Sequence, residues 1–519
     1  MVKQNRFDYI VIGAGSSGCV IANRLSDDQA TKVLLLEAGG PDTKPEIHDA
    51  ANFTSLWGTE VDWGYQTEPE PVLYNRQLSW PRGKVLGGSS SINALLYVRG
   101  NRRDYDQWAS LGNEGWSYDN VLPYFKKSEN YDGGASKYHG AGGPLNVKQK
   151  VAEESHPVEL AFIQAGMEHG YGGPVWDFNG EQQENGCGFH QVTVNPDGTR
   201  CSAAKAFLSP IVNRSNLLIE TGAHTTRLLI ENGRAVGVEY VQDGQTRQAH
   251  AENEVILSAG AVDSPKLLML SGVGPAETLR THGINVVLDL PGVGQNLQDH
   301  ALLGVAFRSK QTYAGQSIFV GEAGLFTYVV ADVASGGGPD LQYHFFRDFH
   351  LGPAELVGDL TAPGFTFLPT LLKPKSTGHI TLRSNSPFDP ARIYANYLTE
   401  DADFKVLVEG IKLARELVQM PAFDPFRGEE MAPGAACSTD ADLREYIKRY
   451  VTTVFHPVGT CRMGSDDQAV VDSRLRLHGI SGLRVADASI MPKIVSANTN
   501  AACIMIGEMA SDMIKGIIS

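Results

Sequence analysis

The sequence has 519 residues and a formal net charge of −15 at pH 7, from 44 Lys and Arg against 59 Asp and Glu. A chain of this length exceeds one simple core, so we expect two large units with room for a buried cofactor. The acidic excess would repel a phosphate backbone, and no nucleic acid is expected as a partner. The six cysteines form no CxxC pair, so the sequence predicts neither a disulfide framework nor a zinc ribbon.

The opening residues, MVKQNRFDYIVIGAG, lead directly into a predicted strand, without the charged, apolar and cleavage regions of a signal peptide. The sequence also has no run of 18 or more apolar residues, which a membrane-spanning helix would need. We therefore expect a cytoplasmic protein with no transmembrane segment.

Residues 7–26, FDYIVIGAGSSGCVIANRLS, predict a buried strand over Tyr9–Ile12, then a glycine turn, then a helix that opens at Ser16 and Ser17. The glycines of the turn are Gly13, Gly15 and Gly18. Amide groups and the dipole at the start of such a helix suit a pyrophosphate.

A second apolar strand, in TKVLLLEAGG (31–40), ends in Glu37, 22 residues after Gly15. An acidic side chain there binds ribose hydroxyls and would repel a 2′-phosphate. This context favours a dinucleotide site over a purely structural strand-to-helix turn. The motif alone does not separate NAD from FAD.

Two further glycine-containing stretches are WPRGKVLGGSSSIN (80–93) and GAVDSPKLLMLSGVG (260–274). Residues Gly83–Asp106, which begin within the first stretch, and the whole second stretch match the two signatures of the glucose-methanol-choline (GMC) family of FAD oxidoreductases. The chain resembles this family nearly end to end. Within this family it is most similar to bacterial choline-dehydrogenase-like and aliphatic alcohol dehydrogenases. The stretches shared with them are DFNG (177–180), SAAKAFL (202–208), GVGQNLQDH (292–300) and HPVGTCRMG (456–464).

The resemblance implies FAD as the cofactor. Some family members tether FAD through a histidine directly before the signature asparagine, where this chain has Ile92. An alkyl side chain cannot form that bond, so we expect non-covalent FAD. The predicted cofactor-binding residues are Gly13, Gly15, Ser16, Ser17, Gly18, Glu37, Ala38, Arg82, Val85, Gly88, Asn93, Thr225 through its backbone, Asp487, Ala488 and Thr499.

Residues 454–464, VFHPVGTCRMG, hold His456, Cys461 and Arg462 in a segment too rich in Gly and Pro for one regular element. A zinc site would need three or four convergent ligands, and no second pair lies nearby, so no metal site is expected. A histidine satisfied within its own loop is the other alternative. We interpret Cys461 and Arg462 as structural.

Family members carry a catalytic histidine at the position of His456 and a His or Asn at the position of Asn498, so the resemblance implies a His/Asn pair. Hydride leaves an alcohol carbon easily only as the hydroxyl loses its proton. An imidazole, with a reference pKa of about 6.5, suits that base. The Asn498 amide can donate a hydrogen bond to the alkoxide-like oxygen, so we expect His456 to be the base and Asn498 to orient the alcohol.

An apolar helix is predicted from about Asn500, with Asn498 and Asn500 both at candidate N-cap positions. In the family this helix points its positive end at the pyrimidine edge of the flavin, where it would stabilise negative charge. His344, in LQYHFF, either lines the pocket or is a half-buried sheet residue, and we favour the second interpretation.

The predicted fold class is α/β (α+β), a Rossmann-type FAD-binding domain interleaved with a substrate domain built on a mainly antiparallel sheet with helices. Evidence for the second domain comes from alternating stretches such as DLQYHFF and GHITLRS and from one amphipathic helix, DFKVLVEGIKLARELVQ. The expected FAD-binding segments are 1–155, 201–300 and 451–519, the last with the catalytic His and Asn. The expected substrate-domain segments are 156–200 and 301–450.

After residue 300, relatives most similar to this chain usually carry a few dozen more residues, including a helix over the substrate entrance. Here the covering segment is LLGVAFRSKQTYAGQSIF (302–319), with Phe307, Tyr313 and Phe319 as its aromatics. We expect a wider mouth that tolerates branched or aryl alcohols. The alternative is that a loop near 352–364 closes the gap.

The leading hypothesis is FAD-dependent oxidation of a primary alcohol to the aldehyde by a dehydrogenase or oxidase, with oxygen, a quinone or a soluble carrier as electron acceptor. A hydroxynitrile lyase on the same fold is the runner-up. The light-driven decarboxylases of the family lack a histidine at the position of His456, which argues against them. Choline would need a carboxylate and aromatic faces around its ammonium, and the sequence shows no such cage.

Overall fold

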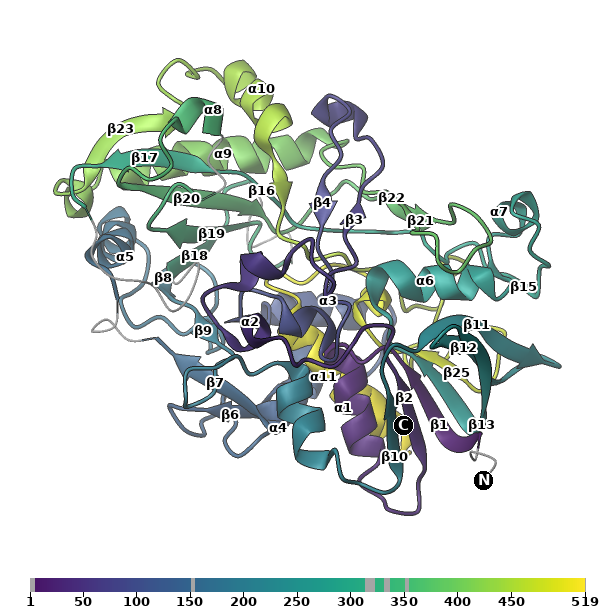
Figure 1. Cartoon of the computed structure of the whole chain (residues 1–519). Helices are drawn as coiled ribbons and strands as arrows, with labels where there is room; N and C mark the ends of the chain where they lie inside the picture. The colour runs from purple at the N-terminus through teal and green to yellow at the C-terminus, as the bar shows by residue number, and fades with distance from the viewer. Residues whose placement is uncertain (1–4, 151–154, 313–322, 331–336, 351–353, 519) are drawn as a thin grey trace.

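The computed structural model describes residues 5–150, 155–312, 323–330, 337–350 and 354–518. Two large sheets dominate it, one at the lower right and one at the upper left of Figure 1. Helices cover both sheets, and the predicted α/β class with a Rossmann-type unit beside a mainly antiparallel one is confirmed.

The first sheet has seven strands and contains the predicted nucleotide-binding elements. The strands β10, β2, β1, β13 and β25 run parallel, whereas β12 and β11 extend the sheet antiparallel along the first half of β13. Their bounds are β1 Arg6–Ile12, β2 Val33–Leu36, β10 Leu217–Glu220, β11 His224–Glu231, β12 Arg234–Gln242, β13 Gln245–Leu257 and β25 Leu483–Val485.

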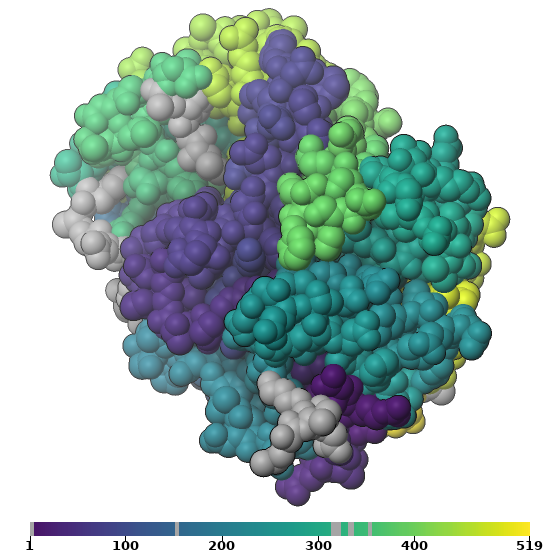
Figure 2. Space-filling view, turned by 45° about the vertical axis from the view of Figure 1, so that its right-hand side comes forward, coloured from purple at the N-terminus to yellow at the C-terminus, as the bar shows by residue number. Residues whose placement is uncertain are grey.

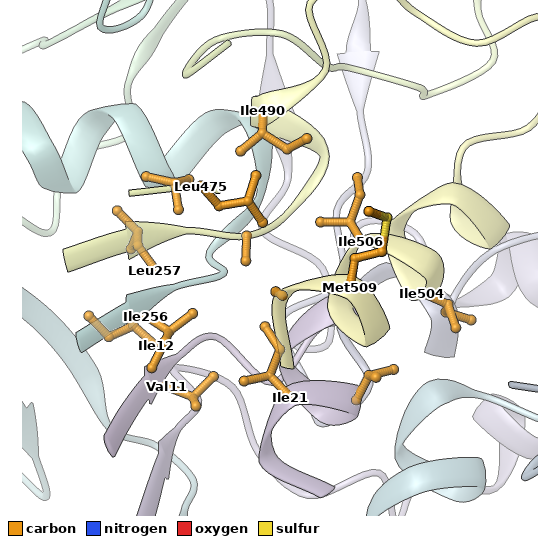
Figure 3. Close-up of a cluster of buried hydrophobic side chains, with 14 of the residues drawn as sticks. Val11, Ile12, Ile21, Ile256, Leu257, Leu475, Ile490, Ile504, Ile506 and Met509 are labelled. Carbon is orange, nitrogen blue, oxygen red and sulfur yellow. The ribbon is translucent and has the colours of Figure 1, made fainter. Parts of the chain in front are cut away.

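The apolar runs predicted as strands are buried because both faces of the parallel sheet are covered. Helices α1 (Ser16–Leu25) and α11 (Asn500–Ile514) pack together on one face. Figure 3 shows side chains of β1, α1, β13 and α11 converging in one apolar cluster. The C-terminal helix therefore lies against the first helix of the chain and completes the core of the nucleotide-binding unit.

The second sheet has eight strands, and all of its pairings are antiparallel. Its main order is β23–β17–β20–β19–β18–β8, with β16 bridging β20 and β24. Helices α5 (Pro157–His169) and α9 (Asp401–Val418) pack on it, and α9 confirms the predicted amphipathic helix. The strand bounds are β8 Gly186–Phe189, β16 Ala301–Leu302, β17 Val305–Ser309, β18 Ala323–Thr327, β19 Leu341–Phe346, β20 Gly364–Leu371, β23 Arg427–Ala432 and β24 Thr452–Thr453.

Shorter elements connect the two sheets, and the hairpin of β3 and β4 rises between them in Figure 1. Figure 2 shows this early part of the chain, in indigo, crossing the middle of the surface. Their bounds are β3 Tyr65–Gln66, β4 Ser79–Trp80, β5 Leu96–Tyr97, β6 Glu129–Tyr131, β7 Leu145–Gln149, β9 Gln191–Val192, β14 Val273–Gly274, β15 Leu288–Asp289, β21 His379–Thr381 and β22 Arg392–Tyr394. The remaining α-helices are α2 Pro45–His48, α3 Arg102–Ser110, α4 Tyr118–Ser128, α6 Gly260–Leu270, α7 Ala276–Thr281, α8 Ala354–Val357 and α10 Asp440–Tyr450.

The prediction that the segment after residue 300 covers the substrate entrance is wrong for the first half of that segment. Residues 301–309 form β16 and β17 inside the large sheet, and Phe307 is buried against Phe365 and Phe367. The strands form because alternate residues pack on the sheet's apolar face, so Phe307 does not guard an entrance. Tyr313 and Phe319 lie outside the described residues.

Two smaller expectations also differ from the structure. The stretch GHITLRS contributes β21, which pairs with β22 in a separate hairpin and not in the large sheet. The helix α11 begins at Asn500 as predicted, but Thr499 is its N-cap residue, without a side-chain cap bond. The Asn500 side chain instead accepts a hydrogen bond from Ser16 Oγ at 2.6 Å, because α1 lies close to α11. The domain boundaries stay predictions.

Substitution of Gly507 is expected to destabilise the contact between α1 and α11. A Cβ atom at Gly507 would lie 2.8 Å from the Ser17 carbonyl oxygen and 2.9 Å from Val20 Cβ, so Gly507→Val forces the helices apart. Overpacking of this kind costs about 1–3 kcal/mol. Thermal unfolding should show a lower midpoint for Gly507→Val than for the parent. The control Gly40→Ala, whose added Cβ has no atom within 4 Å, should unfold like the parent.

Candidate active site and cofactor cradle

A single elongated cavity brings most of the predicted site residues together. It begins at the glycine turn after β1 and extends to the inner face of the large antiparallel sheet. The predicted residues that line it are Gly13, Gly15, Ser16, Ser17, Glu37, Ala38, Arg82, Gly88, Asn93, Thr225, His456, Asp487, Ala488, Asn498 and Thr499.

Gly18 and Val85 are the two predicted residues that do not line the cavity. A Cβ at Gly18 would lie 1.9 Å from the Gly13 carbonyl oxygen, so this glycine allows the turn to pack on its own helix. Val85 is buried in a small apolar cluster that includes Ile92. Contact of either residue with a cofactor stays a prediction.

The glycine turn forms an open cradle at the start of α1. Gly15 caps this helix with no side-chain bond, and a Cβ there would meet no atom within 4 Å. Opposite it, Gly88 has a φ of +53°, and a Cβ at Gly88 would lie 2.7 Å from Gly15 Cα. Only glycine fits such an approach of two backbones, which leaves the first amides of α1 free to bind a phosphate.

Glu37 lies at the end of β2, where its carboxylate accepts hydrogen bonds from the Ala14 and Gly39 amides at 2.9 and 2.8 Å. Burial raises the pKa of this carboxyl to about 7, while the two amide bonds act in the opposite direction. The side chain is therefore fixed at the edge of the cavity, as a ribose-binding group would be.

Two further cavity residues have the properties expected of nucleotide ligands. The buried Thr225 Oγ1 has no hydrogen-bond partner among the described residues. The Asp487 carboxylate is buried and accepts bonds from the Gly260 amide and Ser264 Oγ, at 2.9 and 2.6 Å. The orphaned hydroxyl, the open helix start and the acidic residue after β2 together fit a dinucleotide such as FAD.

His456 lies deeper in the cavity and is held at both its backbone and its ring. Its backbone N–H donates to Asp299 Oδ1 at 2.6 Å. Its ring Nδ1 lies 3.0 Å from His300 Nδ1, and its Nε2 lies 3.3 Å from Asn498 Nδ2. The structure therefore brings the two predicted catalytic residues together, and it assigns His456 three specific partners from distant parts of the chain.

The loop before His456 is unusual in its backbone. Phe455 has a φ of +64°, a left-handed conformation that costs energy for an aromatic residue. Its carbonyl oxygen accepts a 2.6 Å bond from Arg82 Nη2, and its N–H donates to Thr453 Oγ1 at 2.7 Å. Asp299 also accepts hydrogen bonds from the hydroxyls of Thr453 and Tyr397. These contacts impose the conformation that turns His456 into the cavity.

Burial decides the charge of the residues around this point. It holds the pKa of His456 well below the ordinary value of 6.5, and the neighbouring His300, Arg82 and His344 act in the same direction. Burial raises the pKa of Asp299 to about 6, against the hydrogen bonds that favour its charged form. His456 is thus a neutral imidazole at neutral pH, with the protonation state of a base.

The wall opposite the nucleotide end was mostly missed by sequence reasoning. His344 is 3% exposed, not half-buried, and it lines the cavity from β19. The other wall residues from this sheet and the loop after β19 are Leu302, Phe346, His350, Leu368 and Thr453. Asp299 and His300 were recognised only as part of the LQDH stretch, whose recurrence in the family was the one available signal.

No group of three or more His, Cys, Asp or Glu side chains is placed to hold a metal ion within the described ranges. Cys461 is buried, and Arg462 forms an ion pair with Asp466. None of the helices described combines the length and apolarity that crossing a bilayer requires.

Comparison with known proteins agrees with the geometry of this cavity. Family models for GMC oxidoreductases match residues 7–302 and 374–507. The chain belongs to the GMC oxidoreductase family. GMC oxidoreductases bind FAD, so FAD as the cofactor and the predicted FAD-dependent alcohol dehydrogenase or oxidase class are confirmed. That this cavity holds the FAD stays a prediction.

Several known proteins align with nearly the whole chain. An oxygen-dependent choline dehydrogenase from Cronobacter sakazakii is 42% identical, with 98% of this chain and 95% of the relative aligned. An alcohol dehydrogenase [acceptor] from Pseudomonas putida is 43% identical, with the same coverage. Among solved structures, a pyridoxine 4-oxidase from Mesorbium loti superimposes with a TM-score of 0.91 at 32% identity, over 97% of this chain and 98% of that one.

Substitution of Asp299 tests how this GMC oxidoreductase positions His456. Asp299→Leu leaves the His456 N–H and two buried hydroxyls without an acceptor, and the left-handed Phe455 loop loses its anchor. We expect alcohol oxidation to fall roughly 10- to 100-fold with FAD still bound, as for other groups that orient a reactive side chain. Asp299→Asn, which keeps an acceptor oxygen, should lose less. Equal losses in both variants would show that the hydrogen bond to His456 has no part in positioning.

Proposed function

We propose that this protein oxidises a neutral primary alcohol to the aldehyde, with His456 as the base and Asn498 orienting the alcohol oxygen. The observation that carries the proposal is the 3.3 Å approach of His456 Nε2 and Asn498 Nδ2 at the inner end of the cavity. The names of the similar choline, alcohol and pyridoxine enzymes support an alcohol as substrate class.

The two side chains divide the work on the alcohol. A neutral imidazole nitrogen accepts the hydroxyl proton, and its lowered pKa keeps it unprotonated at neutral pH. In the structure an N–H of Asn498 points to His456 Nε2. An alcohol whose proton enters Nε2 displaces that N–H, and the amide then donates to the alcohol oxygen. The buried Asn498 Oδ1 has no partner among the described residues, which leaves it available to a ligand.

The residues that would hold FAD are those of the glycine cradle, with Glu37, Thr225 and Asp487. When bound, FAD supplies the acceptor for the hydride that leaves the alcohol carbon. The chain's own part is to remove the hydroxyl proton, hold the oxygen and exclude water from a site where His456 is 8% and Asn498 9% exposed.

The wall contributed by the large sheet points to an uncharged substrate. No carboxylate is among its described lining residues, which are Leu302, His344, Phe346, His350, Leu368 and Thr453. Burial lowers the pKa of His344 and His350, so both imidazoles are neutral. Nearby, the Arg82 guanidinium adds positive potential at His456. A quaternary ammonium would leave water without finding a counter-charge in this wall, at a substantial desolvation cost.

Replacement of the base is expected to stop the reaction while leaving the cofactor in place. His456→Ala should reduce the rate of flavin bleaching by alcohol under anaerobic conditions by roughly 10² to 10⁴, the range for a positioned base. Asn498→Ala should lose less, because water can partly replace an amide donor. Bleaching of His456→Ala at the parent rate would place the base elsewhere.

The parent protein in the same experiment separates the candidate activities. Bleaching by an alcohol supports oxidation, and recovery of the yellow colour on admission of air would make oxygen the acceptor. Absence of bleaching by a wide alcohol panel, together with release of cyanide from a cyanohydrin, would favour the hydroxynitrile lyase hypothesis instead.

Bound FAD is expected to be released completely on denaturation. Ile92, buried beside the cradle, offers no atom for a covalent bond at the position where some family members carry a linking histidine. Acid or heat treatment followed by filtration should move all flavin fluorescence into the filtrate. Fluorescence that stays with the polypeptide would reveal a tether at another residue.

Choline and its neutral carbon isostere, in which a tert-butyl group replaces the trimethylammonium, provide a matched test of the uncharged wall. The two alcohols have nearly the same shape and differ by one charge. We expect kcat/KM for the isostere to exceed that for choline by at least tenfold, a difference of about 1.4 kcal/mol in transition-state binding. A preference for choline would contradict a neutral substrate while leaving alcohol oxidation itself intact.

A further inference from the structure

A series of hydrogen bonds connects the backbone just after β20 to the side chain of Asn498. The rings of His300 and His456 lie between these two ends. The Leu372 carbonyl oxygen lies 3.1 Å from His300 Nε2, and His300 Nδ1 lies 3.0 Å from His456 Nδ1. His456 Nε2 then lies 3.3 Å from Asn498 Nδ2. The two rings stand nearly perpendicular, at 86°, with centroids 5.2 Å apart.

The protons in this series take their direction from the carbonyl end, where backbone bonds with Leu372 and Val495 both favour a hydrogen on the His300 ring. A carbonyl oxygen only accepts, so His300 Nε2 must carry the hydrogen that it donates to Leu372. His300 is fully buried, and burial lowers the pKa of its ring to about 3, so the ring is neutral and has one N–H. His300 Nδ1 is therefore an acceptor.

The tautomer of His300 determines the position of the hydrogen on His456. Since His300 Nδ1 accepts, the hydrogen between the two rings belongs to His456 Nδ1. A neutral His456 then has its lone pair on Nε2, the atom beside Asn498. The amide orientation agrees, because Asn498 Nδ2 donates toward that lone pair. With the amide reversed, His456 Nε2 would need a hydrogen, and His300 would have to present a lone pair to the Leu372 carbonyl.

We infer that His300 is a positioning residue that holds His456 in the Nδ1–H tautomer and so presents its basic Nε2 to the substrate. This inference rests on the proposed function for the role of Nε2, but the tautomer itself follows from the hydrogen bonds. In the opposite tautomer the Nε2 hydrogen would occupy the place that the alcohol proton must enter, and no base would face the substrate.

The surroundings hold His300 in the orientation this role needs. It directly follows Asp299, which accepts the His456 N–H, and its own carbonyl accepts the Val454 N–H at 3.0 Å. Both ring nitrogens of His300 are engaged, so the ring cannot flip without losing both bonds. When His456 takes up a proton at Nε2, its Nδ1–H stays bonded to His300, which fixes the imidazolium in the same place.

Nitrogen NMR of the protein labelled in its histidines tests the tautomer without any turnover. The His456 signals are assigned by their loss in His456→Gln. We expect neutral His456 in the parent holoenzyme to carry its proton on Nδ1 and to have an unprotonated Nε2. A neutral His456 that carries its proton on Nε2 would overturn the inference, whether or not the protein oxidises alcohols.

Variants of His300 test the consequence for the reaction. His300→Leu removes the acceptor, so the Nε2–H form should become populated, and the rate of anaerobic flavin bleaching should fall roughly 10- to 100-fold. The alcohol's dissociation constant should change less than threefold, because His300 does not line the cavity. His300→Gln can accept from His456 through Oε1 and donate to Leu372 through Nε2, so it should recover most of the rate.

A matched control is His282→Gln at the C-terminal cap of α7, where the ring Nδ1 lies 2.9 Å from the Thr278 carbonyl oxygen. This variant should have the parent's rate of anaerobic flavin bleaching, and its His456 should be the same tautomer as in the parent. Equal bleaching rates in the parent and in His300→Leu with FAD bound, or equal losses in His300→Leu and His300→Gln, would overturn the inference. If His300→Leu fails to fold, the NMR of the parent and the rate of His300→Gln decide the question. Failure of every alcohol to bleach the parent would refute the proposed function alone.

Discussion

The buried carboxylate of Asp299 is the interaction on which the site depends. It lies where the chain leaves the nucleotide-binding unit and enters the large antiparallel sheet, and it accepts the N–H of His456 at 2.6 Å. Hydroxyls of Thr453 and Tyr397 donate to the same carboxylate. A buried carboxylate is stable only with such partners, so both segments must meet here with the correct spacing.

The contact between these two segments explains the strained backbone of Phe455, directly before His456. Phe455 adopts a left-handed φ, a conformation that costs energy for an aromatic residue. The Arg82 guanidinium and the Thr453 hydroxyl hold its two backbone groups, so the strain is balanced by hydrogen bonds. The first signature loop thereby takes part in placing His456, although the two are more than 370 residues apart in sequence.

Low exposure sets the chemistry of the inner cavity. The rings of His300, His344 and His456 all lose affinity for protons because burial penalises the charged form. The proposal of an uncharged alcohol rests on the neutral imidazole of His456 and on a wall whose described lining residues include no carboxylate. The family models and the similarity to choline dehydrogenases show the family and the cofactor, whereas the choice of alcohol is proposed from the wall residues of this chain.

The sequence by itself determined the glycine turn and the family, and it predicted the pair of His456 and Asn498. The glycine turn, Glu37 and the two signature loops are local patterns, since each depends on spacing within one strand, turn and helix. His456 and Asn498 were identified by resemblance to the family. The tertiary structure alone decided that Phe307 enters a sheet, that His344 lines the cavity, and that Asp299 and His300 contact His456. These depend on contacts between residues far apart along the chain, which no spacing rule encodes, because burial and hydrogen-bond partners exist only after the two units have packed together.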